Sequence, residues 1–210
     1  MKSYSQSSQD KFVVLLLESK REGFYLEIGG NDPININNTY LLESDYNWKG
    51  LSVEIDESLV RKYNNIRSNK CYHKNALTVD YKEFLDSCNV PHQIDYLSID
   101  IEPPQNTYAC LKMLVNSGRR FSVITFEHEF YYAGPSIREE SRQFLRENGY
   151  VLIAGNVSNI GYIYEDWYVD PTALQESVWK PIVCDNLDSF DHNLIIKRAQ
   201  EHMVAKNSDK

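Results

Sequence analysis

The sequence lacks any run of basic residues, and its formal net charge is −8. Binding to DNA or RNA depends on clustered Lys and Arg side chains that neutralise phosphates. Nucleic acids are therefore not expected substrates. Internal repeats of about 20 to 50 residues and Pro- or Ser-rich linkers are also absent, so we expect the 210 residues to form one domain.

Cysteine is scarce and scattered along the chain. The four cysteines are Cys71, Cys88, Cys110 and Cys184. They include no C-x-x-C pair, which argues against a zinc ribbon, a redox dithiol or the disulfide framework of a secreted protein. We expect reduced thiols.

No apolar run is long enough to cross a bilayer, since the longest spans only Phe12–Leu17. The first ten residues lack the basic-then-apolar order of a signal peptide. These absences favour a cytoplasmic protein without a membrane span. Hydrophobic residues make up 42% of the chain and charged residues 25%, which is ordinary for a chain with a packed core.

Short runs of β-branched and aromatic residues alternate with longer polar segments of helical pattern, which is typical of βαβ units that build a parallel sheet. The expected strands are Phe24–Ile28, Gly50–Ile55, Lys70–His73, Ile94–Ile101 and Phe121–Phe126. The expected helices are Asp10–Arg21, Asn38–Tyr46, Glu57–Arg67, Tyr81–Cys88, Thr107–Ser117 and Ser136–Asn148. In such sheets, ligands bind beyond the carboxyl ends of the strands.

The C-terminal part of the pattern differs from the rest. Tyr150–Ile153 and Gly161–Glu165 are separated by the turn sequence Gly-Asn-Val-Ser-Asn, which is too short for a crossover helix. We therefore expect them to form an antiparallel terminal hairpin. Residues 1–22 are expected to be a helical lead, and residues 200–210 a frayed tail.

The first two strands end in residues suited to a nucleoside. Glu27 lies inside the first strand, and Gly29 and Gly30 follow it, where the backbone can approach a ligand closely. Glu54 ends the second strand, where a carboxylate can accept hydrogen bonds from a ribose diol. A third glycine is missing, which disfavours a dinucleotide pyrophosphate.

Acidic residues and a histidine follow the fourth and fifth strands. Asp100 and Glu102 end one strand, and Glu127 and His128 end the next. Two carboxylates and an imidazole suit Mg²⁺ or Mn²⁺, which would hold an acceptor hydroxyl and favour its alkoxide. The alternative is metal-free catalysis, in which His128 acts as general base. A satisfied structural network remains a further alternative.

An aromatic loop follows these residues. Tyr131 and Tyr132 could shape an acceptor pocket, because sugar rings stack on aromatic faces. We expect Arg138 and Trp167 to line the same pocket. With 15 tyrosines in the chain, a core or surface role for such residues stays open.

Together, the order and spacing of several short motifs resemble FkbM-type, class I S-adenosylmethionine-dependent methyltransferases. The motifs are Ser5–Asp10, Leu26–Pro33 with Asn38–Thr39, Trp48–Gly50 before Val53–Glu54, Asn75–Leu77, Asp95–Glu102, Thr125–His128, Ser141–Arg142 with Gly149–Tyr150, and Glu165–Trp167. The resemblance covers most of the chain. It implies a Rossmann-like α/β fold with a mostly parallel seven-stranded sheet, an antiparallel terminal hairpin and helices on both faces.

The resemblance also implies roles for single residues. Residues expected at the cofactor are Gln9, Glu27, Gly29, Gly30, Asn38, Glu54, Ala76, Leu77, Asp80 and Asp100. Metal ligands would be Asp100, Glu127 and His128, and the same residues with Glu102 would form the catalytic set. His128 stands where similar sugar O-methyltransferases have a second acid, which favours His128 as a base.

The function expected from this resemblance is transfer of a methyl group from S-adenosylmethionine to a sugar hydroxyl in a glycan or glycoconjugate. Alternatives are a metal-independent small-molecule methyltransferase with His128 as base, and a non-catalytic nucleotide-fold module of a glycan-biosynthesis protein. A nicotinamide-dependent oxidoreductase would share Glu54 but needs a third glycine and a hydride-handling site such as a Tyr-x-x-x-Lys pair. Tyr108 and Lys112 have this i, i+4 spacing, which gives that option slight support. We expect a monomer or a homodimer.

Overall fold

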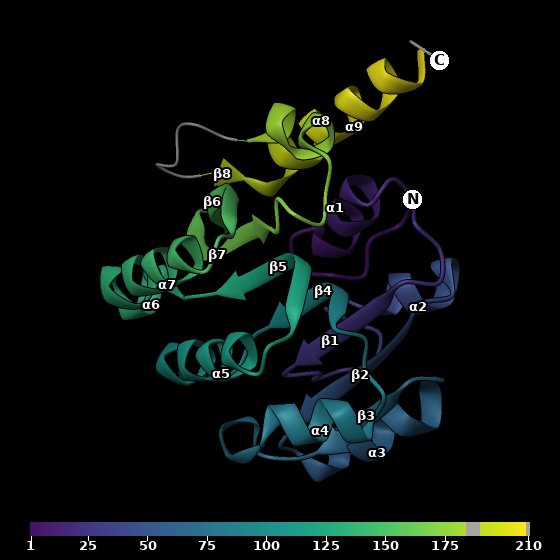
Figure 1. The fold of residues 1–210 in the computed structure, drawn as a ribbon, viewed down its shortest axis with the longest axis vertical. Helices are drawn as coiled ribbons and strands as arrows, with labels where there is room; N and C mark the ends of the chain where they lie inside the picture. Colours follow the sequence, from purple (N-terminus) through teal and green to yellow (C-terminus); the bar gives the residue numbers. More distant parts are fainter. Residues whose placement is uncertain (184–189, 209–210) are drawn as a thin grey trace.

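The computed structural model describes residues 1–183 and 190–208 (Figure 1). Cys184 lies outside these residues. The strands are β1 (Phe24–Ile28), β2 (Lys49–Glu54), β3 (Lys70–His73), β4 (Gln93–Ile99), β5 (Arg120–Glu127), β6 (Val151–Asn159), β7 (Tyr162–Val169) and β8 (Phe190–Asp191). They form one sheet in the order β3-β2-β1-β4-β5-β7-β6-β8.

The sheet is parallel from β1 to β5 and becomes mixed beyond β5. β7 runs antiparallel to both β5 and β6, and the two-residue β8 pairs parallel with β6. All seven expected strands are present, and β8 is an addition at the edge. The carboxyl ends of β1, β2, β4 and β5 therefore share one edge of the sheet.

Helices cover both faces of the sheet (Figure 1). They are α1 (Gln9–Leu16), α2 (Tyr40–Tyr46), α3 (Glu57–Ile66), α4 (Tyr81–Ser87), α5 (Pro104–Asn116), α6 (Phe130–Ala133), α7 (Pro135–Glu147), α8 (Glu176–Trp179) and α9 (His192–Ser208), with 3₁₀ turns η1 (Ala76–Thr78) and η2 (Lys180–Ile182). No helix in these ranges is both long and apolar enough to span a bilayer.

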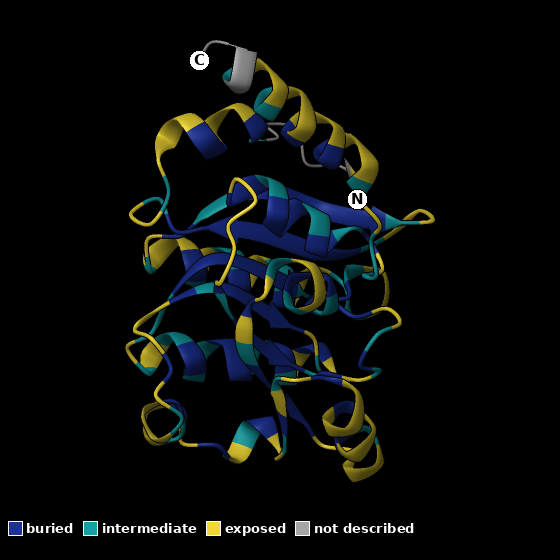
Figure 2. Ribbon diagram, turned by 90° about the vertical axis from the view of Figure 1, so that its right-hand side faces the viewer, coloured by how far each residue is buried: buried dark blue, intermediate teal, exposed yellow. Residues whose placement is uncertain are grey.

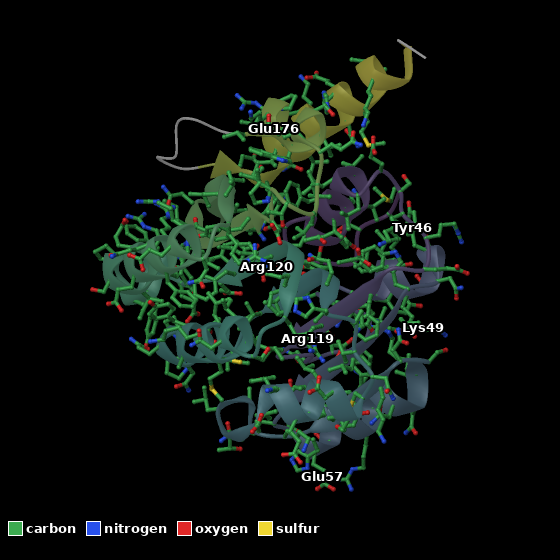
Figure 3. The ribbon with its side chains drawn as sticks, viewed as in Figure 1. Tyr46, Lys49, Glu57, Arg119, Arg120 and Glu176 are labelled. Carbon is green, nitrogen blue, oxygen red and sulfur yellow. The ribbon has the colours of Figure 1, made fainter. Side chains whose placement is uncertain are left out.

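Two apolar clusters form the core, one on each face of the sheet. Adjacent strand residues point to opposite faces, so Tyr25 belongs to the cluster that contains Phe12 of α1, while Leu26 belongs to the cluster that contains Leu111 of α5. The strands are accordingly buried and the outer sides of the helices exposed (Figure 2). Figure 3 shows the side chains as sticks, with exposed Glu57 and Glu176 near opposite ends of the molecule.

Side-chain caps fix where the helices begin beyond the strand ends. Asp56 accepts hydrogen bonds from the backbone N–H groups of Ser58 and Leu59 at the start of α3. Asp80 accepts one from Glu83 at the start of α4. Such caps satisfy N–H groups that lack partners within the helix. Asp80 therefore caps a helix, which is a structural role in addition to the place beside adenine that was expected from the sequence.

The C-terminal part differs from two expectations. Within the expected frayed tail, residues 200–210, the described residues 200–208 belong to helix α9, where His202 donates a hydrogen bond to the carbonyl oxygen of Ser177 and Lys206 pairs with Glu18. The expected turn, residues 155–159, lies within β6, and the chain reverses at Ile160 and Gly161.

Candidate active site

A cavity of about 390 Å³ lies at the carboxyl ends of β1, β2 and β4. It is lined by Gly29, Asn31, Val53, Glu54, Ile55, Lys74, Asn75, Ala76, Leu77, Asp100, Ile101, Glu102 and Asn106. This volume is within the range of sites for small molecules and cofactors. Six residues predicted from the sequence meet in this one cavity: Gly29, Glu54, Ala76, Leu77, Asp100 and Glu102.

Gly29 makes the close approach between β1 and β4 that forms the cavity wall. Its φ of +87° is in the left-handed region, and an added Cβ would lie 1.8 Å from the carbonyl oxygen of Asp100. Only glycine fits both conditions. The backbone at Gly29 is therefore closely approached, as predicted, but by the carbonyl oxygen of Asp100 and not by a ligand.

Glu54 is held at the cavity by backbone hydrogen bonds. Its Oε2 accepts from the N–H of Asn31 at 2.9 Å, and its Oε1 accepts from Ile55 and Asp56 at 2.7 and 2.9 Å. The residue is only 9% exposed. These bonds fix the carboxylate on the cavity wall, with lone pairs left over for a ligand's hydroxyl groups.

Glu27 and Gly30 lie outside the cavity lining. The Glu27 carboxylate is buried and accepts hydrogen bonds from Asn37 at 3.1 Å, Thr39 at 3.0 Å and Ser52 at 2.7 Å. Asn37 and Thr39 belong to the loop between β1 and α2. Glu27 therefore anchors this loop, and its expected direct contact with the cofactor is replaced by a supporting role.

Asp100 and Glu127 form a hydrogen-bonded carboxyl pair where β4 and β5 end. Burial, followed by repulsion from Asp100, raises the pKa of Glu127 to about 11. The pKa of Asp100 is also raised, by the loss of solvation of its carboxyl group and by the charges of Glu102 and Glu54, although the residue is exposed at the cavity. Two carboxyl groups this close cannot both ionise readily, so the pair holds a proton at neutral pH.

His128 does not join this pair. It is completely buried, its Nδ1 accepts a hydrogen bond from the backbone N–H of Phe130, and its Nε2 lies 3.3 Å from Asp166 without a well-aligned bond. Arg142 donates to both oxygens of Asp166 at 2.7 and 2.8 Å. The predictions of His128 as metal ligand and as base are therefore wrong, since both ring nitrogens face other groups.

No group of three metal-ligating side chains occurs in residues 1–183 and 190–208. Of the predicted ligands, only the carboxyl groups of Asp100 and Glu127 lie together, because the imidazole of His128 faces Asp166. These residues therefore do not fit the three-ligand site expected from the sequence.

Glu165 of β7 lies beside Glu127 in the sheet register. It accepts hydrogen bonds from Gln9 at 2.9 Å and from the indole of Trp167 at 2.6 Å, and burial raises its pKa to about 8. Trp167 is fully buried and packs against Phe12, with ring centroids 4.4 Å apart. The prediction of Trp167 in an acceptor pocket is therefore wrong, and Gln9 supports the strand ends without lining the cavity.

Two further hollows lie beside the first cavity and share Tyr131. One, of about 380 Å³, is lined by Glu102, Pro103, Glu129, Tyr131 and Tyr132. The other, of about 270 Å³, is lined by Gln6, Glu127, Tyr131, Asn159, Ile160, Tyr162 and Tyr164. Glu102 also lines the first cavity, so the larger hollow adjoins that cavity, and the smaller hollow adjoins the larger one at Tyr131. Tyr131 and Tyr132, which the sequence predicts at an acceptor pocket, thus line a hollow next to the first cavity.

Three remaining predicted residues do not line these cavities, although Asp80 lies in a hollow that shares Lys74 and Asn75 with the first one. Arg138 donates to Asn156 at 2.9 Å and stacks on Phe130, where it stabilises the α6–α7 region. Asn38 donates to Ser98 at 2.9 Å. Asp80, besides capping α4, lines a separate hollow of about 400 Å³ next to Lys74 and Asn75.

The sequence interpretation missed several lining residues. Asn31, Lys74 and Asn106 line the first cavity. Tyr162 and Tyr164 line the hollow of about 270 Å³. Asn31 follows the Gly29–Gly30 turn directly, which was a usable signal. Tyr162 and Tyr164 alternate along a strand of the hairpin, and only the order of β7 beside β5 brings them to the site.

No family model matches the chain, and no curated protein matches it by sequence. Solved structures resemble it in fold. An O-methyltransferase from Bacillus cereus in complex with SAH has a TM-score of 0.58 at 20% identity, over 80% of this chain and 84% of that one. The chain has the Rossmann-like fold of class I methyltransferases.

Two other solved structures have the same fold. A human methyltransferase 10 domain containing protein has a TM-score of 0.52 at 9% identity, over 77% of this chain and 80% of that one. An rRNA methylase from Streptococcus thermophilus has a TM-score of 0.50 at 13% identity, over 83% of this chain and 99% of that one. The fold class predicted from the sequence is thus confirmed.

Proposed function

We propose that this protein is an S-adenosylmethionine-dependent O-methyltransferase that acts on a hydroxyl of a sugar. The observation that carries this proposal is the placement of the Asp100–Glu127 pair between two cavities. Asp100 lines the cavity that contains Glu54, and Glu127 lines the aromatic hollow beside it. A cofactor and an acceptor bound in these cavities would meet at the pair.

The charge of the first cavity supports S-adenosylmethionine as the ligand. Glu54, Asp100 and Glu102 line it, and Lys74 is the lone Lys or Arg in the described lining. When bound, S-adenosylmethionine would supply an electrophilic methyl group on a positively charged sulfonium. Carboxylates attract such a cation and repel a pyrophosphate.

The loop after β1 also disfavours a dinucleotide. α2 begins only at Tyr40, and residues 29–39 separate it from β1, so no helix N-terminus directly follows the glycine turn to bind a pyrophosphate. Tyr108 of α5 donates to the backbone carbonyl of Glu140 in α7. Tyr108 and Lys112 therefore do not supply a hydride-transfer site in this cavity.

In the proposed reaction, the acceptor hydroxyl loses its proton to the carboxyl pair as its oxygen forms a bond to the methyl carbon. The carbon–sulfur bond breaks, and its electron pair stays on sulfur, which becomes neutral. Asp100 is the proton acceptor, because Glu127 already holds its proton at neutral pH. The chain's other task is alignment of the acceptor with the methyl group.

The acceptor class is supported by the exposed aromatic side chains. Tyr131 and Tyr162 are 53% and 60% exposed and meet edge to face, with ring centroids 5.3 Å apart. Such faces suit the CH groups of a sugar ring. The resemblance to FkbM-type enzymes and the fold shared with an O-methyltransferase support the same reaction.

Incubation of the protein with isotopically labelled S-adenosylmethionine and a panel of glycosides tests this function. The proposal predicts label transfer to at least one glycoside, and transfer that persists in the presence of a chelator. Binding of S-adenosylmethionine without transfer to any glycoside would favour the non-catalytic alternative. Loss of transfer with the chelator would contradict the carboxyl pair as sufficient base.

A further inference from the structure

The two hollows that share Tyr131 are lined by both aromatic and acidic side chains. Aromatic faces are exposed there, with Tyr131 at 53%, Tyr132 at 76% and Tyr162 at 60%. The same hollows are lined by the carboxyl groups of Glu102, Glu127 and Glu129, and by no Lys or Arg in the described lining. The site therefore combines π faces with negative charge.

Glu129 is the most informative of these acids. It is 92% buried, being 8% exposed. Its Oε1 accepts one long hydrogen bond of 3.4 Å from the Tyr131 hydroxyl, and no hydrogen bond to its Oε2 occurs in the part of the chain that the structure describes. Because Glu129 lines the hollow, this oxygen is available to a ligand.

Among the other buried acids, Glu27, Glu54 and Glu165 accept hydrogen bonds from neutral groups, and Asp166 and Asp170 pair with cations. Arg142 pairs with Asp166, and Arg120 pairs with Asp170. By contrast, within residues 1–183 and 190–208, neither Glu129 nor Glu102 forms an ion pair. Glu129 is mostly buried and has one long hydrogen bond and no cation, whereas Glu102 beside it is exposed. A buried carboxylate with so little compensation is costly, so a cation supplied by a ligand would complete this site.

We propose that the acceptor is an amine-bearing sugar, whose ammonium group binds between Glu102 and Glu129 against the ring of Tyr131. This inference rests on the proposed function and names its substrate class. An ammonium group forms charge-assisted hydrogen bonds with carboxylates and attracts aromatic faces. The sugar ring then reaches toward Glu127, whose carboxyl group joins this hollow to Asp100.

The lining argues against other ligands. A phosphorylated or carboxylated acceptor would face the three acids without a compensating Lys or Arg. A divalent cation needs several oxygen ligands grouped around one point, and the described residues contain no such group of three. An organic amine requires only one or two carboxylates and an aromatic face.

Calorimetric titration of the protein saturated with S-adenosylhomocysteine tests the inference. The probes are methyl glucosaminide, its N-acetyl derivative and methyl glucoside, which differ at one position. We expect the amine to bind at least about tenfold more tightly than either neutral glycoside, as a charged hydrogen bond permits. Equal affinities, tighter binding of the N-acetyl derivative, or no binding of the amine would overturn the inference.

Matched variants locate the effect. Glu129→Gln and Glu102→Gln should each bring the three affinities to within about twofold, since a neutral amide loses the charge-assisted bond. The circular dichroism spectrum reports whether each variant folds. Affinity for S-adenosylhomocysteine is a second control for Glu129→Gln alone, because Glu102 also lines the cofactor cavity. Glu140→Gln, an exposed residue on α7, makes the same charge change outside the site and should keep the preference. A preference that survives in both site variants would place the amine elsewhere and overturn the inference.

Two other results are informative. If Mg²⁺ or Mn²⁺ alone binds at these acids and displaces the amine, the cation is a metal and the inference fails. The titration with S-adenosylhomocysteine, run first, reports on the proposed function separately. No binding there rejects that function, whereas binding without amine preference rejects only the acceptor class.

Discussion

A Cβ atom on Gly29 would lie 1.8 Å from the carbonyl oxygen of Asp100. The obstacle is backbone at the end of a buried strand, so it cannot move aside as a flexible side chain could. This contact brings the turn after β1 against the residue that would accept the proton. The cavity and the proposed catalytic pair thus depend on one glycine.

Gly29→Ala should therefore lower the free energy of unfolding by more than about 2 kcal/mol and weaken S-adenosylhomocysteine binding. Gly118→Ala is the matched control. Gly118 has a similar φ of +85° but no atom within 4 Å of an added Cβ, so it should show only the left-handed strain, roughly 1 kcal/mol. Urea unfolding measures both, and equal losses would show that the contact with Asp100 is unimportant.

Asp100 and Glu127 should respond differently to neutral substitution. Glu127 is protonated at neutral pH, because burial and Asp100 raise its pKa to about 11, and Gln resembles that protonated form. Glu127→Gln should therefore reduce kcat by less than about tenfold, whereas Asp100→Asn removes the base and should reduce it by about 10² to 10⁴. Methyl-transfer rates of the two variants test this difference. Equal losses of kcat would contradict the assignment of Asp100 as the base.

The raised pKa of Glu127 also predicts how stability depends on pH. In the unfolded chain Glu127 loses its proton near its ordinary pKa of 4.5, whereas in the folded protein it keeps the proton until about 11. The folded state binds more protons between these values, so its stability should fall as pH rises through this window. Thermal unfolding from pH 5 to 9 should show a shallower decline in Glu127→Gln. A parallel decline in both proteins would refute the raised pKa.

The buried pair of Arg142 and Asp166 predicts the opposite dependence. Burial alone would raise the pKa of Asp166, but the two hydrogen bonds from Arg142, together with the nearby ring of His128, outweigh it and hold the pKa below its ordinary value of 3.8. Arg142→Leu should cost about 3 to 5 kcal/mol at pH 7, since it leaves a buried charge unpaired.

This stabilisation is fully present above pH 3.8 and is lost as pH falls further, toward the lowered pKa of Asp166. The difference in unfolding free energy between wild type and Arg142→Leu should therefore narrow from pH 7 to pH 3. Denaturant titrations at the two pH values measure it. A difference that stays constant would mean that Asp166 is not the paired group.

Much of the fold was predictable because buried strands have a distinctive pattern. Phe24–Ile28 and Lys70–His73 have the bounds expected from the sequence. Helix α9 was missed because it is mostly polar, and its few buried residues, such as Ile195 and Ala199, gain their role only by packing in the core cluster with α1. The sequence of an isolated segment does not reveal that partner.

The site was predictable where it depends on strand ends, and unpredictable where it depends on side-chain direction. Glu54 and Asp100 end neighbouring parallel strands and do line one cavity. His128 directly follows Glu127, but consecutive residues of an extended chain point to opposite sides. Glu127 faces Asp100, while His128 faces Asp166. Trp167 was misplaced because nothing local showed that it packs on Phe12.

The central claim is that the cavity beside Glu54 and Asp100 binds the nucleoside of S-adenosylmethionine. Calorimetric titration with S-adenosylhomocysteine and, separately, with NAD tests it most directly, using wild type, Glu54→Gln and the exposed control Glu57→Gln. We predict that one S-adenosylhomocysteine binds per chain, more tightly than NAD. Its affinity should be at least about tenfold weaker in Glu54→Gln and unchanged in Glu57→Gln. Absence of binding by S-adenosylhomocysteine, or tighter binding of NAD, would contradict the account.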